Sequence, residues 1–189
     1  MMTTERERML RGLPYDATDA GLVGERSRAR QLTYAFNHAA PDDESARARA
    51  LDALVAHCGA RVRIEPPFHC DYGTNLWLGD DVTMNFNCVV LDCAPVRIGQ
   101  RVLIGPNVQM LTATHPLAVA DRLDGREVAL PITIDDDVWL GAGVIVCPGV
   151  TIGAGSVIGA GSVVVSDVPA GVLCVGNPCR VVRKLADGD

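Results

Sequence analysis

The sequence predicts a mainly β protein, a parallel β-solenoid that follows a helical segment. Two patterns support this prediction. Aliphatic residues or methionine recur at every sixth position after about residue 61, whereas the first 60 residues carry the three-to-four-residue spacing of amphipathic helices. We therefore expect a helical segment at 1–60, a solenoid at 61–179 with a protruding loop at 114–131, and a tail at 180–189.

The composition restricts the possible partners. The chain carries 17 basic and 23 acidic side chains, a formal charge of −6, which argues against binding to nucleic acid or to an anionic membrane. No apolar run approaches the roughly 20 residues that span a bilayer, and the N-terminus lacks the apolar stretch of a secretory signal. We expect a cytoplasmic protein with soluble partners.

The seven cysteines are odd in number and include no C-x-x-C pair, so neither a disulfide framework nor a zinc knuckle is indicated. We expect reduced thiols, several of them packed in the core, and no metal. The pairs Cys88/Cys93 and Cys174/Cys179 leave metal binding as an alternative to packing.

Two amphipathic helices are expected in the first 60 residues. The apolar positions of the first are Leu22, Ala29, Leu32 and Phe36. The second follows Pro41, with Asp42 or Asp43 as the N-cap and Gly59 as the stop. The arginines between the apolar positions, Arg26 among them, are expected to form a solvated face.

The solenoid prediction comes from an invariant step of six. The positions fall into three groups: Leu78, Met84 and Val90; Ile98, Ile104 and Met110; and Ile134, Leu140, Val146, Ile152, Ile158 and Val164. Each position ends a triplet whose first and third side chains share one face, and turn formers such as Gly-Ala-Gly follow. Short strands that are followed by bends at a fixed period stack in parallel on the preceding turn.

Interruptions of the repeat locate the loops. Two extra residues lie between Val90 and Ile98, around 92–95, and the step from Met110 to Ile134 is 24. Because the longer gap keeps the phase of the repeat, residues 114–131 are expected to leave the coil and return in register, with His115 at the exit. After Val164 the phase slips by five, Val175-Gly176-Asn177-Pro178 resumes the pattern, and the coil is expected to end there, before the tail.

Five motifs stand out along the chain. They are Cys70-Asp71-Tyr72-Gly73-x-Asn75, Asn85-Phe86-Asn87-Cys88, Thr112-Ala113-Thr114-His115-Pro116, Val138-Trp139-Leu140-Gly141 and Gly176-Asn177-Pro178-x-Arg180. Together they resemble the hexapeptide-repeat acyltransferases, and more closely the maltose and galactoside O-acetyltransferases, over nearly the whole chain. The resemblance implies a left-handed parallel β-helix and a homotrimer with active sites in clefts between neighbouring coils. It also implies acetyl-coenzyme A along the cleft and a sugar near the histidine.

Acetyl transfer to a sugar needs a base, because a hydroxyl is a poor nucleophile at neutral pH. Histidine suits this task with its unperturbed pKa of about 6.5. We expect His115 to be the base and the hydroxyl to attack the thioester directly, since one cleft that holds both substrates supplies the orientation. A nucleophilic Cys88 or Cys147 is the competing possibility, but no histidine stands at a recognisable spacing from either. The alternative for His115 is a hydrogen-bonding role at a corner of the coil.

The resemblance places four further residues beside the acceptor. Asn85 is expected to orient the hydroxyl or to donate to the developing oxyanion, and Asp92, Asp71 and Asp16 are expected to accept from sugar hydroxyls. Each has an ordinary turn residue as its alternative. The position after Asp92, acidic in some relatives, is Cys93 here, which leaves the identity of the acceptor open.

The resemblance also assigns a coenzyme A site. Pantetheine is expected along a row of small residues on a coil edge: Gly141, Ala142, Ala160, Val165 and Ser166. Trp139 is expected to pack on the cofactor arm or to cover a subunit interface. Arg180 and Arg183 are expected to bind the nucleotide phosphates, with a basic surface tail as the alternative.

The predicted function is therefore acetyl-CoA-dependent O-acetylation of a maltose-like or glucose-like sugar. A galactoside, a chitin-type oligosaccharide and a xenobiotic hydroxyl are alternative acceptors. A metal-dependent hydratase is disfavoured, because only His69 and His115 fall in the repeat region and no histidine pair has ligand spacing. A non-catalytic β-helix assembly subunit is the remaining alternative.

Overall fold

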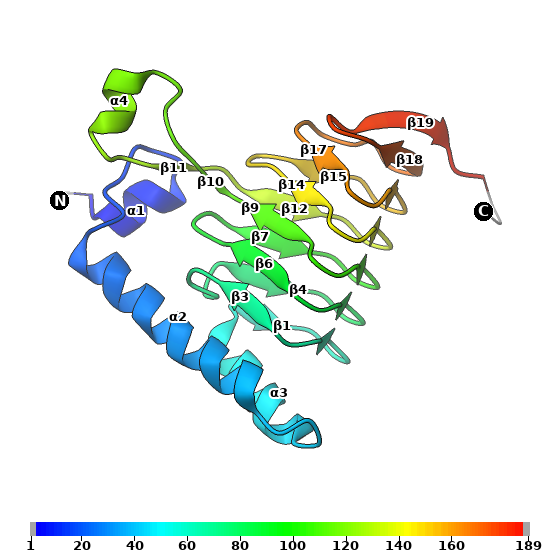
Figure 1. The fold of residues 1–189 in the computed structure, drawn as a ribbon, viewed down its shortest axis with the longest axis horizontal. Helices are drawn as coiled ribbons and strands as arrows, with labels where there is room; N and C mark the ends of the chain where they lie inside the picture. Colours follow the sequence, from blue (N-terminus) through cyan, green and yellow to red (C-terminus); the bar gives the residue numbers. More distant parts are fainter. Residues whose placement is uncertain (1–2, 187–189) are drawn as a thin grey trace.

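The computed structural model describes residues 3–186. It consists of N-terminal helices followed by a three-sided, left-handed parallel β-helix, and a loop with a short helix projects from one side (Figure 1). The predicted fold class is confirmed. We call the three sheets the first, second and third face, in the order in which each turn of the coil visits them.

The strands of each face are short. The first face contains β1 (His57–Cys58), β4 (Leu76–Leu78), β7 (Val96–Ile98), β12 (Ile132–Ile134) and β15 (Thr151–Ile152). The second contains β2 (Arg63–Ile64), β5 (Thr83–Met84), β8 (Leu103–Ile104), β13 (Trp139–Leu140), β16 (Val157–Ile158), β18 (Val172–Val175) and β19 (Arg180–Lys184). The third contains β3 (Phe68–Cys70), β6 (Cys88–Leu91), β9 (Gln109–Leu111), β14 (Ile145–Val146) and β17 (Val163–Val164).

The six-residue repeat forms the core of the coil. Every repeat position from Leu78 to Val164 is buried, and parallel pairing places equivalent positions in register, as with Ile98, Ile134 and Ile152 on the first face. Each fully buried aliphatic side chain contributes about 1.5–3 kcal/mol relative to exposure. The core is therefore a column of aliphatic side chains along the axis of the coil.

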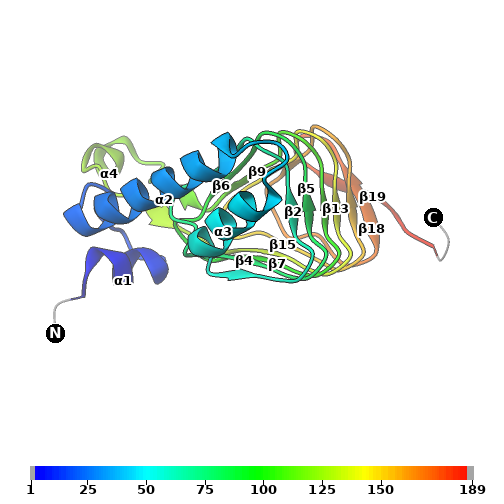
Figure 2. The same ribbon diagram turned by 90° about the horizontal axis from the view of Figure 1, so that it is seen from below.

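Three helices precede the coil: α1 (Glu5–Leu10), α2 (Ala20–His38) and α3 (Glu44–Leu54). Of these, α2 and α3 pack together and cover the open end of the coil at its first turn (Figure 2). Asp19 caps α2, and Asp43, not Asp42, caps α3. The sequence pattern did not predict α1, although its capping box, formed by Thr4 and Glu7, is a local signal for a helix start. Within residues 3–186, no helix has the length and hydropathy to cross a bilayer.

The long loop leaves the third face after β9 and returns to the first face at β12. Its two arms pair as an antiparallel hairpin, β10 (Ala113–Thr114) with β11 (Val128–Ala129), and α4 (Val119–Leu123) lies at its tip. The hairpin lies beside α1, so the N-terminal segment and the loop meet on one side of the coil (Figure 1).

The C-terminal end of the coil is irregular. The coil continues beyond Val164, because Val168 bridges to Ile152 and β18 continues the second face in parallel with β16. Residues 180–184, predicted as part of a tail, form β19, which returns antiparallel to β18. The six-residue step does not predict these two strands. β18 follows the irregular segment 165–171, which stands in place of a regular turn, and β19 is antiparallel and so lies outside the parallel repeat. Residues 187–189 of the predicted tail lie outside the described part.

Candidate active site

The predicted site residues lie on two different edges of the coil. The second–third edge, where the chain passes from the second face to the third, carries Asn85, Gly141, Ala142 and Ala160. The third–first edge carries Asp71, Asp92, His115, Val165 and Ser166. The third face separates them, and its four-residue strand β6 spans on the order of 13 Å. The predicted site residues of one chain therefore lie in two groups on opposite sides of this face.

His115 is exposed at the end of β10, where the loop leaves its hairpin. In the hairpin Thr114 pairs with Val128, so the position opposite His115 is Glu127. Glu127 forms a β-bridge with Tyr15, and the Tyr15 hydroxyl donates to its carboxylate at 2.7 Å. The N-terminal segment thus fixes the base of the loop beside His115.

A polar cluster adjoins this anchor, formed by Tyr15, Arg26, Asp71, Tyr72, Cys93 and Glu127. The Cys93 thiol donates to the carboxylate of Asp71 at 3.4 Å. Arg26 donates to the Tyr72 hydroxyl and to the carbonyl of Ala17, both at 2.6 Å. The predicted solvated face is therefore wrong for Arg26, whose partner lies 46 residues away in the sequence, beyond the reach of helical periodicity.

Burial controls the protonation of this cluster. It raises the pKa of Asp71, and the hydrogen bond from Cys93 and the charge of Arg26 partly oppose it. Burial also raises the pKa of the Cys93 thiol, so the thiol stays protonated near neutral pH and can donate to Asp71. The half-buried Asp71 carboxylate is thus placed to accept hydrogen bonds next to the loop that carries His115.

Asp92 has a different role from the one predicted. Its side chain is fully buried, and its carboxylate accepts from the backbone N–H groups of Asp71, Tyr72 and Asn75 at 3.1, 2.8 and 3.2 Å. Burial raises its pKa to about 6, and the backbone hydrogen bonds act in the opposite direction. The expected direct contact with a sugar is therefore wrong. Asp92 holds the backbone of the turn from which Asp71 projects.

The remaining acceptor candidates are accessible. Asn85 is half-buried, and its side-chain oxygen accepts from the Phe86 N–H at 2.7 Å, which leaves the amide nitrogen to donate to a ligand. Asp16 is exposed and accepts from the Thr18 N–H and hydroxyl, and these hydrogen bonds lower its pKa. Asp16 also lines a pocket of about 260 Å³ together with Asp124 and Arg126 at the loop tip.

The second–third edge provides a row of small residues. Ala142 and Ala160 are exposed on successive turns of the coil. Gly141 is buried, and a Cβ there would lie 2.6 Å from the backbone nitrogen of Ala160, so stacking of the turns already requires a glycine at this position. Trp139 is 53% exposed on the second face and pairs with Leu103, which is 51% exposed.

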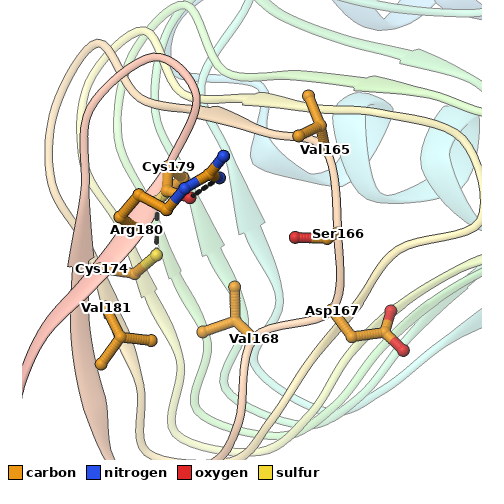
Figure 3. Close-up of a pocket in the computed structure, with 8 residues that line it drawn as sticks. All are labelled: Val165, Ser166, Asp167, Val168, Cys174, Cys179, Arg180 and Val181. Atoms are coloured by element: carbon orange, nitrogen blue, oxygen red, sulfur yellow. Dashed lines mark hydrogen bonds between the residues drawn. The ribbon is translucent and has the colours of Figure 1, made fainter.

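Three of the predicted coenzyme A residues line one pocket at the end of the coil. This terminal pocket, of about 430 Å³, is lined by Val165, Ser166, Asp167, Val168, Cys174, Cys179, Arg180 and Val181 (Figure 3). Arg180 begins β19, and Arg183 lies on the same strand. Within residues 3–186, no group of three or more His, Cys, Asp or Glu side chains is arranged to hold a metal ion.

Comparison with known proteins agrees with this architecture. Residues 8–59 match the maltose acetyltransferase hexapeptide capping motif, and residues 131–166 match the bacterial transferase hexapeptide repeats. The chain is 40% identical to the galactoside O-acetyltransferase of Escherichia coli, over 97% of this chain and 90% of that protein.

Two solved structures are similar over almost their whole length. A maltose O-acetyltransferase from Clostridium difficile has a TM-score of 0.96 and 43% identity, covering 97% of this chain and 98% of that one. A hexapeptide-repeat acetyltransferase from Vibrio cholerae, in complex with acetyl-coenzyme A, has a TM-score of 0.91 and 42% identity, covering 97% and 100%.

The coil with its six-residue repeat and N-terminal helical cap defines the class of hexapeptide-repeat acetyltransferases. The match to the maltose acetyltransferase capping motif and the similarity over 97% of this chain narrow the class further. The chain belongs to the maltose and galactoside acetyltransferase family of hexapeptide-repeat enzymes.

Proposed function

We propose that this protein transfers an acetyl group from acetyl-coenzyme A to a hydroxyl of a maltose-like or glucose-like sugar, at a site shared by two chains of a homotrimer. The observation that carries the proposal is the division of the site between two edges, with an exposed His115 on one and Asn85 on the other. Two chains that place the third–first edge of one beside the second–third edge of the other bring such half-sites together.

The outward side chains support this assembly. The second face exposes Leu103 and Trp139, and the third face carries partly exposed Val89 and Ile145. The first face is polar, with Arg97 stacked on the Trp77 ring at 4.4 Å. Association with further chains would bury these apolar side chains and leave the polar first face in water.

His115 acts as the general base in this proposal. Its imidazole removes the proton of the sugar hydroxyl while the hydroxyl oxygen attacks the thioester carbonyl carbon. The amide nitrogen of Asn85, from the neighbouring chain, donates to the oxyanion that develops on the carbonyl oxygen. The carbon–sulfur bond then breaks, and the imidazolium returns its proton to the coenzyme A thiolate.

The coenzyme would extend from this point along the coil edges. Ala142 and Ala160 are exposed and have small side chains, so pantetheine can approach the coil edge closely. Arg180 in the terminal pocket, with Arg183 on the same strand, would bind the nucleotide phosphates. The acetyl-CoA complex of the Vibrio cholerae relative supports acetyl-CoA as the donor.

The polar cluster supports a polyhydroxylated acceptor. Asp71 supplies a half-buried carboxylate and Asp16 an exposed one on the same side of the coil as His115, and both accept hydrogen bonds. Such groups discriminate strongly against acceptors that lack the matching hydroxyls. A galactoside, a chitin-type oligosaccharide or a xenobiotic hydroxyl are alternative acceptors for the same chemistry.

The test is release of coenzyme A from acetyl-CoA across a panel of sugars, comparing the parent with His115→Ala. We expect at least a hundredfold loss of kcat, the lower end for a general base. His57→Ala, which removes another exposed imidazole on the first face, is the matched control and should retain parental turnover. Parental turnover of His115→Ala would contradict the role of the base. A parent that is inactive with every acceptor would favour the assembly-subunit alternative.

A further inference from the structure

Two thiols meet in the terminal pocket. Cys174 lies on β18 and Cys179 directly precedes β19, and their Sγ atoms are 2.6 Å apart (Figure 3). Both cysteines are free. The two sulfurs are in direct contact, so a disulfide, whose sulfurs lie about 2.0 Å apart, can form with only a small further approach. Two other thiols have different neighbours: Cys88 contacts carbonyl groups and Cys93 contacts Asp71.

The pair lies at the start of the strand that carries the phosphate-binding candidates. Arg180 follows Cys179, and its guanidinium donates to the Cys179 carbonyl at 2.9 Å. β19 is an edge strand at the end of the second face, and all five of its residues are exposed. Exposed edge strands open more readily than buried ones, and opening of β19 would carry Arg180 away from the pocket.

We propose that Cys174 and Cys179 form a reversible dithiol–disulfide site, a covalent latch that holds β19 and Arg180 against the terminal pocket in the oxidised state. The latch itself depends only on the two thiols. Its consequence for coenzyme A rests on the function proposed above for Arg180. Because the disulfide removes the open state of the hairpin, the oxidised protein binds coenzyme A severalfold more tightly than the reduced protein.

The oxidant is a small-molecule disulfide, and the exchange balances in two steps. One protein thiol loses its proton and attacks a sulfur of the small disulfide, which releases the first small thiol and leaves a mixed disulfide. The second protein thiol then attacks the protein sulfur of that bond, forms Cys174–Cys179 and releases the second small thiol. Two electrons pass from the protein sulfurs to the oxidant, and the two small thiols carry the two protons.

The experiment treats the folded full-length protein with 2-hydroxyethyl disulfide and measures intact mass, peptide maps and amide hydrogen exchange. We expect a mass loss of about 2 Da that maps to Cys174–Cys179 and is reversed by dithiothreitol. Exchange of the amides of residues 180–184 should slow at least about fivefold in the oxidised form. Cys174→Ala should show neither change, and Cys147→Ala, which removes a half-buried thiol elsewhere, should show both.

Two results would overturn the latch. One is a folded parent that forms no Cys174–Cys179 bond, and the other is a bond that leaves exchange of residues 180–184 unchanged. Calorimetry then tests separately whether the oxidised protein binds coenzyme A more tightly than the reduced protein. Equal affinity of the oxidised and reduced forms would overturn the link to the coenzyme while the latch stands. Parental affinity of Arg180→Ala, in either redox state, would instead overturn the phosphate-binding role in the proposed function.

Discussion

At the scale of single residues, a buried carboxylate holds the turn that carries Asp71. Asp92 accepts three backbone N–H groups from the turn that presents Asp71. An acid with no exposed surface is an unusual choice for such a task, because the ionised form loses its hydration on folding. The consequence is that Asp92 makes its own contribution to the dependence of the free energy of unfolding on pH.

The sign of that dependence follows from the raised pKa of Asp92. The group titrates near its ordinary pKa of about 4 in the unfolded chain and at about 6 in the folded chain. Its contribution to the free energy of unfolding is therefore fully present below about pH 4 and is lost as the pH rises to about 6. Relative to Asp92→Asn, the parent should lose about 2–3 kcal/mol between pH 4 and pH 7, measured by urea unfolding at one protein concentration. A difference that stays constant with pH would contradict the raised pKa.

Residue types and motifs identified most of the candidate site, but not the direction of the side chains. The T-A-T-H-P segment located His115, and the structure shows its side chain exposed. The same reasoning failed for Asp92, because a carboxylate in a turn gives no sign of whether it faces solvent or the backbone. Arg26 was missed for a related reason. Its partner, Tyr72, comes from a different part of the chain, and no local pattern links them.

At the scale of the repeat element, close stacking of the coil turns determines which residues fit between them. Glycines recur where one turn passes directly over the next. At Gly79, an added Cβ would lie 2.6 Å from the backbone carbonyl carbon and oxygen of Gly99 and 2.9 Å from the nitrogen of Gln100. Backbone atoms cannot move aside as the end of a flexible side chain can, so the spacing of the turns sets the residue type.

Gly79→Ala should therefore lower the free energy of unfolding by about 1–3 kcal/mol, the usual effect of overpacking. Gly24→Ala is the matched control. Gly24 lies within α2, and an added Cβ there has no neighbour within 4 Å, so alanine should raise stability by about 0.5–1 kcal/mol through its better helix propensity. Thermal and urea unfolding of the two variants check both signs. Equal changes in the free energy of unfolding for the two variants would show that stacking of the turns does not restrict position 79 to glycine.

The same repeat explains how much of the fold was predictable. An invariant six-residue step fixes strand length, turn position and the buried column at once, so the coil and its loop could be predicted. The ends of the coil could not, because they break the step. β18 and β19 follow an irregular turn, and the short helices α1 and α4 have six and five residues, too few to show a period.

At the scale of the whole molecule, the fold determines where the candidate active-site residues lie relative to one another. The sequence places His115 and Asn85 30 residues apart, and no pattern shows that they lie on different edges of a three-sided coil. Only the fold separates the candidates into two groups. In the proposed trimer a second chain supplies the missing group, and exposed apolar residues such as Trp139 and Leu103 are available for contact between chains.

Subunit mixing tests this central claim most directly. His115→Ala and Asn85→Ala are each expected to be inactive alone, because each lacks one half of every site. In trimers reassembled from an equal mixture, about a quarter of the interfaces should pair an intact His115 with an intact Asn85, if chains combine at random around a closed ring. We predict recovery of about a quarter of parental coenzyme A release. A mixture that forms mixed trimers, shown by native mass spectrometry, and yet stays inactive would contradict a site shared between chains.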